Sequence, residues 1–224
     1  MIAEAPTKKE SPNGANKGWW KNAPTSTVRR YYKEDLKRKA ENEDITIAEG
    51  TTIHRMVPKT WEEREKKLTG RAYASYTKDD VERYRNISRL FGANNYVDMQ
   101  FKARDVLVSP SAKKRVDEMI KLIDSDPKVR ESVMKSTRNI FLFVPKKYFN
   151  DLEDPKKAER VYRRASYLLA TNKDIRDPYF DRLKEQGYNM VLDDADIKGG
   201  ISKSPIIVFD REKSLEFDKS QTIE

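Results

Sequence analysis

His54 and Arg55 are adjacent residues whose side chains could bind a charged ligand. They end the segment Thr-Thr-Ile-His-Arg, which has the alternation of a strand, so the two side chains should project from opposite faces. The planar guanidinium of Arg55 matches the paired oxygens of a phosphate or a carboxylate. The structural alternative is a surface arginine beside a histidine that has an internal hydrogen-bond partner.

A second group of polar side chains lies on the strand predicted at 71–77. Tyr73, Ser75 and Thr77 share one face of this strand, where their hydroxyls could orient a sugar or an amide. Free backbone N–H groups at the start of the helix that follows Thr77 could attract an anion. A helix cap formed by Thr77 with Asp80 would explain Thr77 without any ligand, but it would not explain Ser75.

Three aspartates, Asp193, Asp194 and Asp196, lie close together ahead of two glycines at 199–200. Clustered carboxylates could stabilise a cation-like transition state, act as a base or hold Mg²⁺. They are also typical of an exposed turn, because aspartate accepts hydrogen bonds from nearby backbone N–H groups. The remaining ligands of a calcium loop are missing from this spacing, so we expect no metal here.

The composition excludes several classes of protein. The 224 residues include 46 Lys and Arg against 37 Asp and Glu, a net charge of +9, with no cysteine and a single histidine. This excludes a disulfide framework, a thiolate site and a multi-histidine metal site within one chain. No stretch approaches the ~20 apolar residues of a membrane span, so we expect a soluble intracellular protein that does not contact a membrane.

The positive charge favours nucleic acid or an anionic small molecule as a partner. Basic runs occur at 113–115 and 163–164, but acidic residues are interspersed with the basic ones along the chain. Such mixing is typical of a solvated helix face. Nucleic-acid binding therefore remains one hypothesis among several.

The chain should form a single domain over 25–224, preceded by an arm over 1–24. The arm is rich in Pro, Gly, Lys and Asn and shows no periodicity, so it should be flexible or ordered by a partner. Trp19 and Trp20 stand side by side within it, and adjacent indoles in a polar segment need a surface to cover them. That surface could be the body of this chain or a protein partner.

Capping residues and hydrophobic alternation predict the elements that position these side chains. Ser111 should begin a helix that runs to about 123. Asp154, followed by Pro155, should begin another that runs to about 170, and we expect Tyr162 and Tyr167 of this second helix to pack. Further helices are expected from 26, from a capping box at 60–63, from 77 and from 178. Strands are expected at 45–57 (a strand or a hairpin around Gly50), 71–77, 95–108, near 191 and at 205–210. This order indicates an α+β fold with small antiparallel sheets flanked by helices.

The order of the motifs resembles that of the ADP-ribosyltransferase-like domains of phage and mobile-element proteins, including the C-terminal extensions of MuF-type phage head proteins. The resemblance covers about residues 45–217 and rests on the segments EGTTIHRMV, GRAYASYTKDD, YFDRLKEQGYNMVLDDADI and SPIIVFD. It implies the mixed fold of that family and NAD as the cofactor. It also implies a setting in the cytoplasm of a host cell or in a virion.

The same resemblance implies roles for particular residues. Arg55, beside His54, would contact NAD, and Ser75 with Thr77 would support the pocket of the nicotinamide ribose. Tyr73 or Tyr76 would stack on the nicotinamide. One of the aspartates of the cluster at 193–196 would stabilise the ribosyl cation.

The family normally places a catalytic glutamate where this chain has only aspartates, which are one methylene shorter. This departure leaves three hypotheses open. The chain binds NAD and transfers ADP-ribose to a protein or a nucleic acid, or it is an inactive virion protein that assembles through Trp19 and Trp20. The third hypothesis is a nucleic-acid-binding protein.

Overall fold

The computed structural model describes residues 42–77, 80–81, 83–84, 95–135, 144–195 and 205–222. The chain divides into two units, Met1–Glu43 and Asp44–Glu224, and nearly all the described residues belong to the second. The expected arm, Trp19, Trp20, the helix predicted from 26 and Asp196 all lie outside the described residues.

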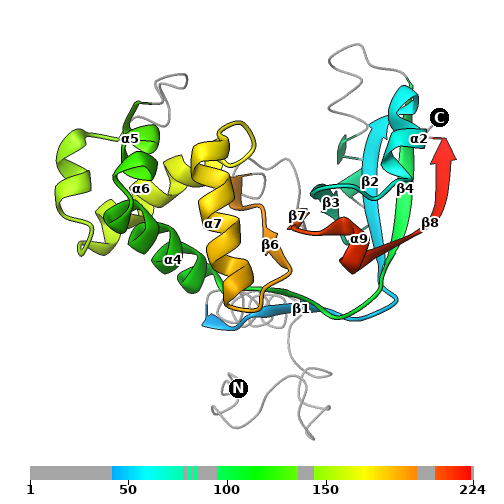
Figure 1. Cartoon of the computed structure of the whole chain (residues 1–224), viewed down its shortest axis with the longest axis horizontal. Helices are drawn as coiled ribbons and strands as arrows, with labels where there is room; N and C mark the ends of the chain where they lie inside the picture. The colour runs from blue at the N-terminus through cyan, green and yellow to red at the C-terminus, as the bar shows by residue number, and fades with distance from the viewer. Residues whose placement is uncertain are drawn as a thin grey trace, which may run out of the picture. The chain divides into compact units, whose positions relative to one another are not determined.

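Antiparallel strands form two sheets in the second unit (Figure 1). The larger sheet has six strands in the order β6-β7-β3-β2-β4-β8, and β1 pairs with β5 in a two-stranded sheet. The strands are β1 (Ile45–Ile47), β2 (Thr52–Pro58), β3 (Ala72–Ser75), β4 (Tyr96–Ala103), β5 (Leu107–Ser109), β6 (Met190–Leu192), β7 (Pro205–Val208) and β8 (Leu215–Thr222). With the helices below, they confirm the predicted α+β fold.

Two of the helices, α4 and α6, begin at the predicted caps. Ser111 Oγ accepts a hydrogen bond from the backbone N–H of Lys114, and Asp154 accepts from those of Lys156 and Lys157. The helical elements are η2 (Lys59–Trp61), α2 (Glu62–Glu65), α4 (Ala112–Ser125), α5 (Pro127–Lys135), η4 (Lys146–Asn150), α6 (Pro155–Leu168), α7 (Lys173–Glu185) and α9 (Arg211–Ser214).

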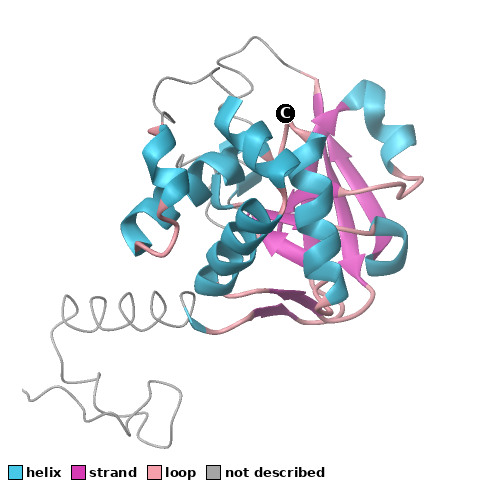
Figure 2. Ribbon diagram, turned by 60° about the vertical axis from the view of Figure 1, so that its left-hand side comes forward, coloured by secondary structure: helices cyan, strands magenta, loops and turns pink. Residues whose placement is uncertain are grey.

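Two hydrophobic clusters cover the two faces of the larger sheet. Tyr73, Val191 and Ile207 face α4, α5, α6 and α7, which lie together on one side in Figure 2. The alternate residues, such as Ala74 and Ile206, join the second cluster. Side-chain alternation along the strands thus places each residue on one face of the sheet. Only polar residues on the same face can contact one another.

Three local predictions are wrong. The strands on either side of Gly50 form no hairpin, because β1 pairs with β5 while β2 pairs with β3 and β4. No side-chain cap is formed at α2, which begins after a 3₁₀ turn. Helix α7 begins at Lys173, capped by Asn172, so Pro178 lies inside it rather than at its start.

Candidate functional site

One row of residues across the larger sheet brings together three of the predicted site residues. His54 lies directly opposite Ser75, and Ser75 lies opposite Pro205. Asp193 extends the row beyond β6, because its backbone N–H donates to the Pro205 carbonyl at 3.0 Å. Residues directly opposite in antiparallel strands share a face, and neighbouring strands lie about 4.8 Å apart. His54, Ser75 and Asp193, hereafter the candidate row, therefore lie on one face.

His54 is held by an acidic partner. Its Nδ1 donates to Asp98 Oδ2 at 2.9 Å, and the same oxygen accepts a hydrogen bond from Gln100 Nε2 at 3.0 Å. All three side chains are buried. A carboxylate on Nδ1 fixes the tautomer of the imidazole and leaves Nε2 as an acceptor.

Ser75 has a similar arrangement. Its hydroxyl donates to Asp80 Oδ2 at 2.8 Å and accepts from the backbone N–H of Thr77 at 3.2 Å. Ser75 thus contacts Asp80 directly, and Thr77 is half-buried. The two central strands therefore present a serine and a histidine, each bound to a buried aspartate.

Tyr73 lies on the same face as Ser75, two residues earlier on β3. Its hydroxyl donates to the Leu169 carbonyl at 3.4 Å, at the end of α6. Burial raises the pKa of Tyr73, and the charge of Asp193 adds to this, against the opposing charges of Arg176 and Arg71. The effect of Asp193 on this hydroxyl is consistent with Asp193 and Tyr73 lying on the same face of the sheet, two residues apart in register. Tyr76 is half-buried against the opposite cluster.

Arg55 lies on the other face of the sheet from His54, as the alternation of the strand predicts. Its Nε donates to Glu65 Oε2 at 2.9 Å, and its Nη1 donates to the Tyr73 carbonyl at 2.8 Å. Arg211 donates to the same Glu65 oxygen at 2.8 Å. The structure therefore separates Arg55 from the candidate row and places it in a buried ion cluster.

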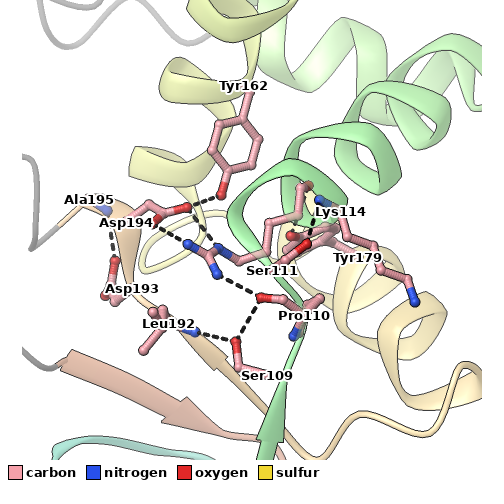
Figure 3. A network of polar contacts seen from close by, with 11 residues as sticks. Ser109, Pro110, Ser111, Lys114, Tyr162, Tyr179, Leu192, Asp193, Asp194 and Ala195 are labelled. Carbon is pink, nitrogen blue, oxygen red and sulfur yellow. Dashed lines mark hydrogen bonds and ion pairs between the residues drawn. The ribbon is translucent and has the colours of Figure 1, made fainter. Parts of the chain in front are cut away.

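Asp193 and Asp194 have different surroundings (Figure 3). Asp194 accepts two hydrogen bonds from Arg115, from Nε at 2.9 Å and from Nη2 at 2.8 Å, and also the Tyr162 hydroxyl. Burial alone would lower the pKa of Arg115, but the charge of Asp194 raises it well above its ordinary value. Asp193 instead accepts a local hydrogen bond from the Ala195 N–H at 3.1 Å. Asp194 is thus engaged in an internal ion pair.

Several residues of these networks were missed by the sequence reasoning. Arg115 was treated as part of a basic run, although it shares the buried face of α4 with Met119 and Leu122 at helical spacing. An arginine on an apolar helix face indicates a buried partner, so the signal was present. No local pattern identifies Asp98, Glu65 or Arg211, whose partners lie far away in the chain.

Comparison with known proteins identifies no relative: no family model, no curated protein and no solved structure matches this chain. Within the described ranges, no group of His, Asp and Glu is arranged to hold a metal ion. None of the described helices is long and apolar enough to cross a membrane.

Proposed function

We propose that this chain binds NAD at the candidate row and transfers its ADP-ribose group. The observation that supports the proposal most is the row itself, which aligns His54, Ser75 and Asp193 on one face of the sheet. These residues come from three of the four segments on which the family resemblance rests. Their alignment depends on strand pairing, which was not used in recognising that resemblance.

The polar groups of the row fit a dinucleotide. His54 Nε2 could hydrogen-bond a ribose hydroxyl or a carboxamide. The Ser75 oxygen, whose proton is donated to Asp80, could take part only as an acceptor, and Tyr73 adds an aromatic ring on the same face. The chemistry that NAD supplies when bound is a ribose–nitrogen bond that breaks with its electron pair on nicotinamide. The carboxylate of Asp193 would stabilise the positive charge then left on the sugar.

Two of the candidate residues receive structural roles in this proposal. Arg55 is engaged by Glu65 and by the Tyr73 carbonyl, and Asp194 is engaged by Arg115. Breaking either pair would leave a buried charge without its partner. Arg55 and Asp194 therefore support the strands that carry the row, and Asp193 is the acidic group of the reaction.

Titration of NAD into the protein by calorimetry, with nicotinamide release followed in parallel, tests this function. We expect His54→Gln and Ser75→Ala to weaken NAD binding at least tenfold, because each removes a ligand hydrogen bond. Asp193→Asn should bind NAD but release nicotinamide about 100-fold more slowly, as loss of a group that stabilises developing charge predicts.

The matched control is Asp181→Asn, which removes the same charge from an exposed position on α7. It should behave as the wild type in both measurements. Absence of NAD binding by the wild type would overturn the proposal as a whole. If Asp193→Asn released nicotinamide as fast as the control does, the transfer step would be refuted and only binding would remain.

A further inference from the structure

An exposed stripe of side chains runs along α6 on the side away from the core. Lys156, Arg160, Arg163 and Tyr167 follow one another at spacings of four, three and four residues, and all four are exposed. This spacing places them on one face of a helix. Tyr167 is 49% exposed, so the expectation that it packs is wrong.

The cations of this stripe are not neutralised. In the part of the chain that the structure describes, no ion pair involves Lys156, Arg160 or Arg163, whereas Lys157 on the next face is paired with Asp151 and Asp154. Glu159 is the exposed acidic residue nearest to the stripe on α6. The stripe therefore keeps a net positive charge.

Helix η4 extends the stripe at its first end. The guanidinium of Arg160 lies over the Tyr148 ring, 5.8 Å from its centroid, and its Nη1 reaches the hydroxyl at 3.5 Å. Lys146 and Lys147 of the same helical turn are exposed and, among the described residues, also have no ion pair. We call the surface of these seven residues the basic stripe: Lys146, Lys147, Tyr148, Lys156, Arg160, Arg163 and Tyr167.

We propose that the basic stripe binds single-stranded nucleic acid. Its helical part is about 16 Å long at 1.5 Å per residue, with neighbouring side chains about 5–6 Å apart. Three cations in line along α6, with Lys146 and Lys147 on the neighbouring η4, match the regular negative charges of a phosphate backbone. The exposed ring of Tyr167 at the end of the line offers a surface on which an unpaired base stacks, and a duplex or an acidic protein would not use this ring in this way.

Fluorescence anisotropy with a labelled oligo(dT) or oligo(U) strand of about 20 nucleotides, without NAD, tests this surface. The triple variant Lys156→Gln/Arg160→Gln/Arg163→Gln should bind at least tenfold more weakly than the wild type. Each single-strand phosphate contact contributes about 0.7 to the slope of log K against log salt, so the slope should fall by about 2.

The matched control is Lys67→Gln/Lys113→Gln/Lys219→Gln, which removes three exposed cations that lie on other elements. It should stay within about threefold of the wild type. Tyr167→Ala should weaken binding about tenfold, and Tyr167→Phe should restore it, because stacking needs only the ring. Thermal unfolding of each variant would verify that it is folded.

Three results would overturn the inference. The first is absence of oligonucleotide binding by the wild type at low salt. The second is an equal loss of affinity in the stripe variant and in the control variant, which would indicate attraction by net charge alone. The third is displacement of the oligonucleotide by polyglutamate at equal charge concentration, which would assign the stripe to an acidic protein.

Discussion

Asp193 and Asp194, adjacent residues after β6, have different hydrogen-bond partners, although nothing in the sequence distinguishes them. Asp194 accepts hydrogen bonds from Nε and Nη2 of the buried Arg115, and the Tyr162 hydroxyl donates to it as well. Asp193 lies on the candidate row, and its carboxylate accepts a local bond from the Ala195 N–H (Figure 3). At the scale of single residues, Asp194 is the carboxylate that neutralises the buried Arg115, and Asp193 is the one that lies in line with Ser75.

Alanine substitution at Asp194 should therefore lower the free energy of unfolding by about 3 kcal/mol, because it leaves Arg115 buried without an anion. Asp193→Asn should lower it by less than about 1 kcal/mol, since the asparagine keeps an oxygen that can accept the bond from the Ala195 N–H and leaves no buried arginine without its anion. Urea denaturation of the two variants beside the wild type measures both values. Equal losses would show that the two carboxylates are not divided in this way.

The carboxylate of Glu118 joins helix α4 to the end of α7. Glu118 accepts hydrogen bonds from Arg182 at 2.5 Å, from Gln186 at 2.8 Å and from Lys121 at 2.8 Å. Burial alone would raise the pKa of Glu118, but these bonds lower it from 4.5 to about 2. The junction between two helices is thus sensitive to acid.

The sign of this pH dependence follows from the lowered pKa. The ionised Glu118 stabilises the fold fully above about pH 4.5, and this contribution is lost as the pH falls toward about 2. Between pH 5 and pH 2 the wild type should lose about 2 kcal/mol more stability than Glu118→Gln, after allowance for solvent screening of the exposed partners. Glu131→Gln, at an exposed site on α5, should follow the wild type in the same denaturation series. A wild-type profile parallel to that of Glu118→Gln would contradict the assignment.

Glu65 binds arginines from two distant segments of the second unit. This buried carboxylate accepts from Arg55 on β2 and from Arg211 on α9, which is 146 residues away in the chain. Arg211 also donates to the Glu65 carbonyl at 2.7 Å. Burial would raise the pKa of Glu65, but the two arginines lower it below its ordinary value. One anion thus neutralises two cations from distant segments.

Removing this charge should affect the stability of the whole unit. Glu65→Gln leaves the buried guanidinium of Arg211 and the half-buried guanidinium of Arg55 without their anion, so we expect a loss of about 3 kcal/mol in the free energy of unfolding. Glu63→Gln, two residues earlier on the exposed side of α2, should change it by less than about 0.5 kcal/mol. Differential scanning calorimetry should show one cooperative transition that moves to lower temperature only in Glu65→Gln. Equal transition temperatures in the two variants would refute this role.

Features that depend on nearby residues were predictable from the sequence by itself. Local hydrogen bonding and side-chain alternation predict the caps Ser111 and Asp154, the opposite faces of His54 and Arg55 and the strands of the larger sheet other than β8. Strand β8 was not predicted. The α+β class followed from the order of these elements. Local pattern failed at Gly50, because the pairing of β1 with β5 is decided by distant backbone groups.

The partners of the charged side chains were decided only by the tertiary structure. Arg115 meets Asp194 across 79 residues, and His54 meets Asp98 across 44. Burial makes an unpaired charge costly, so each buried ionic group is bound to whichever partner the packing of strands and helices brings near it. For this reason the sequence could propose Arg55 and three aspartates as equivalent candidates, while strand register aligned Asp193 with Ser75 and His54.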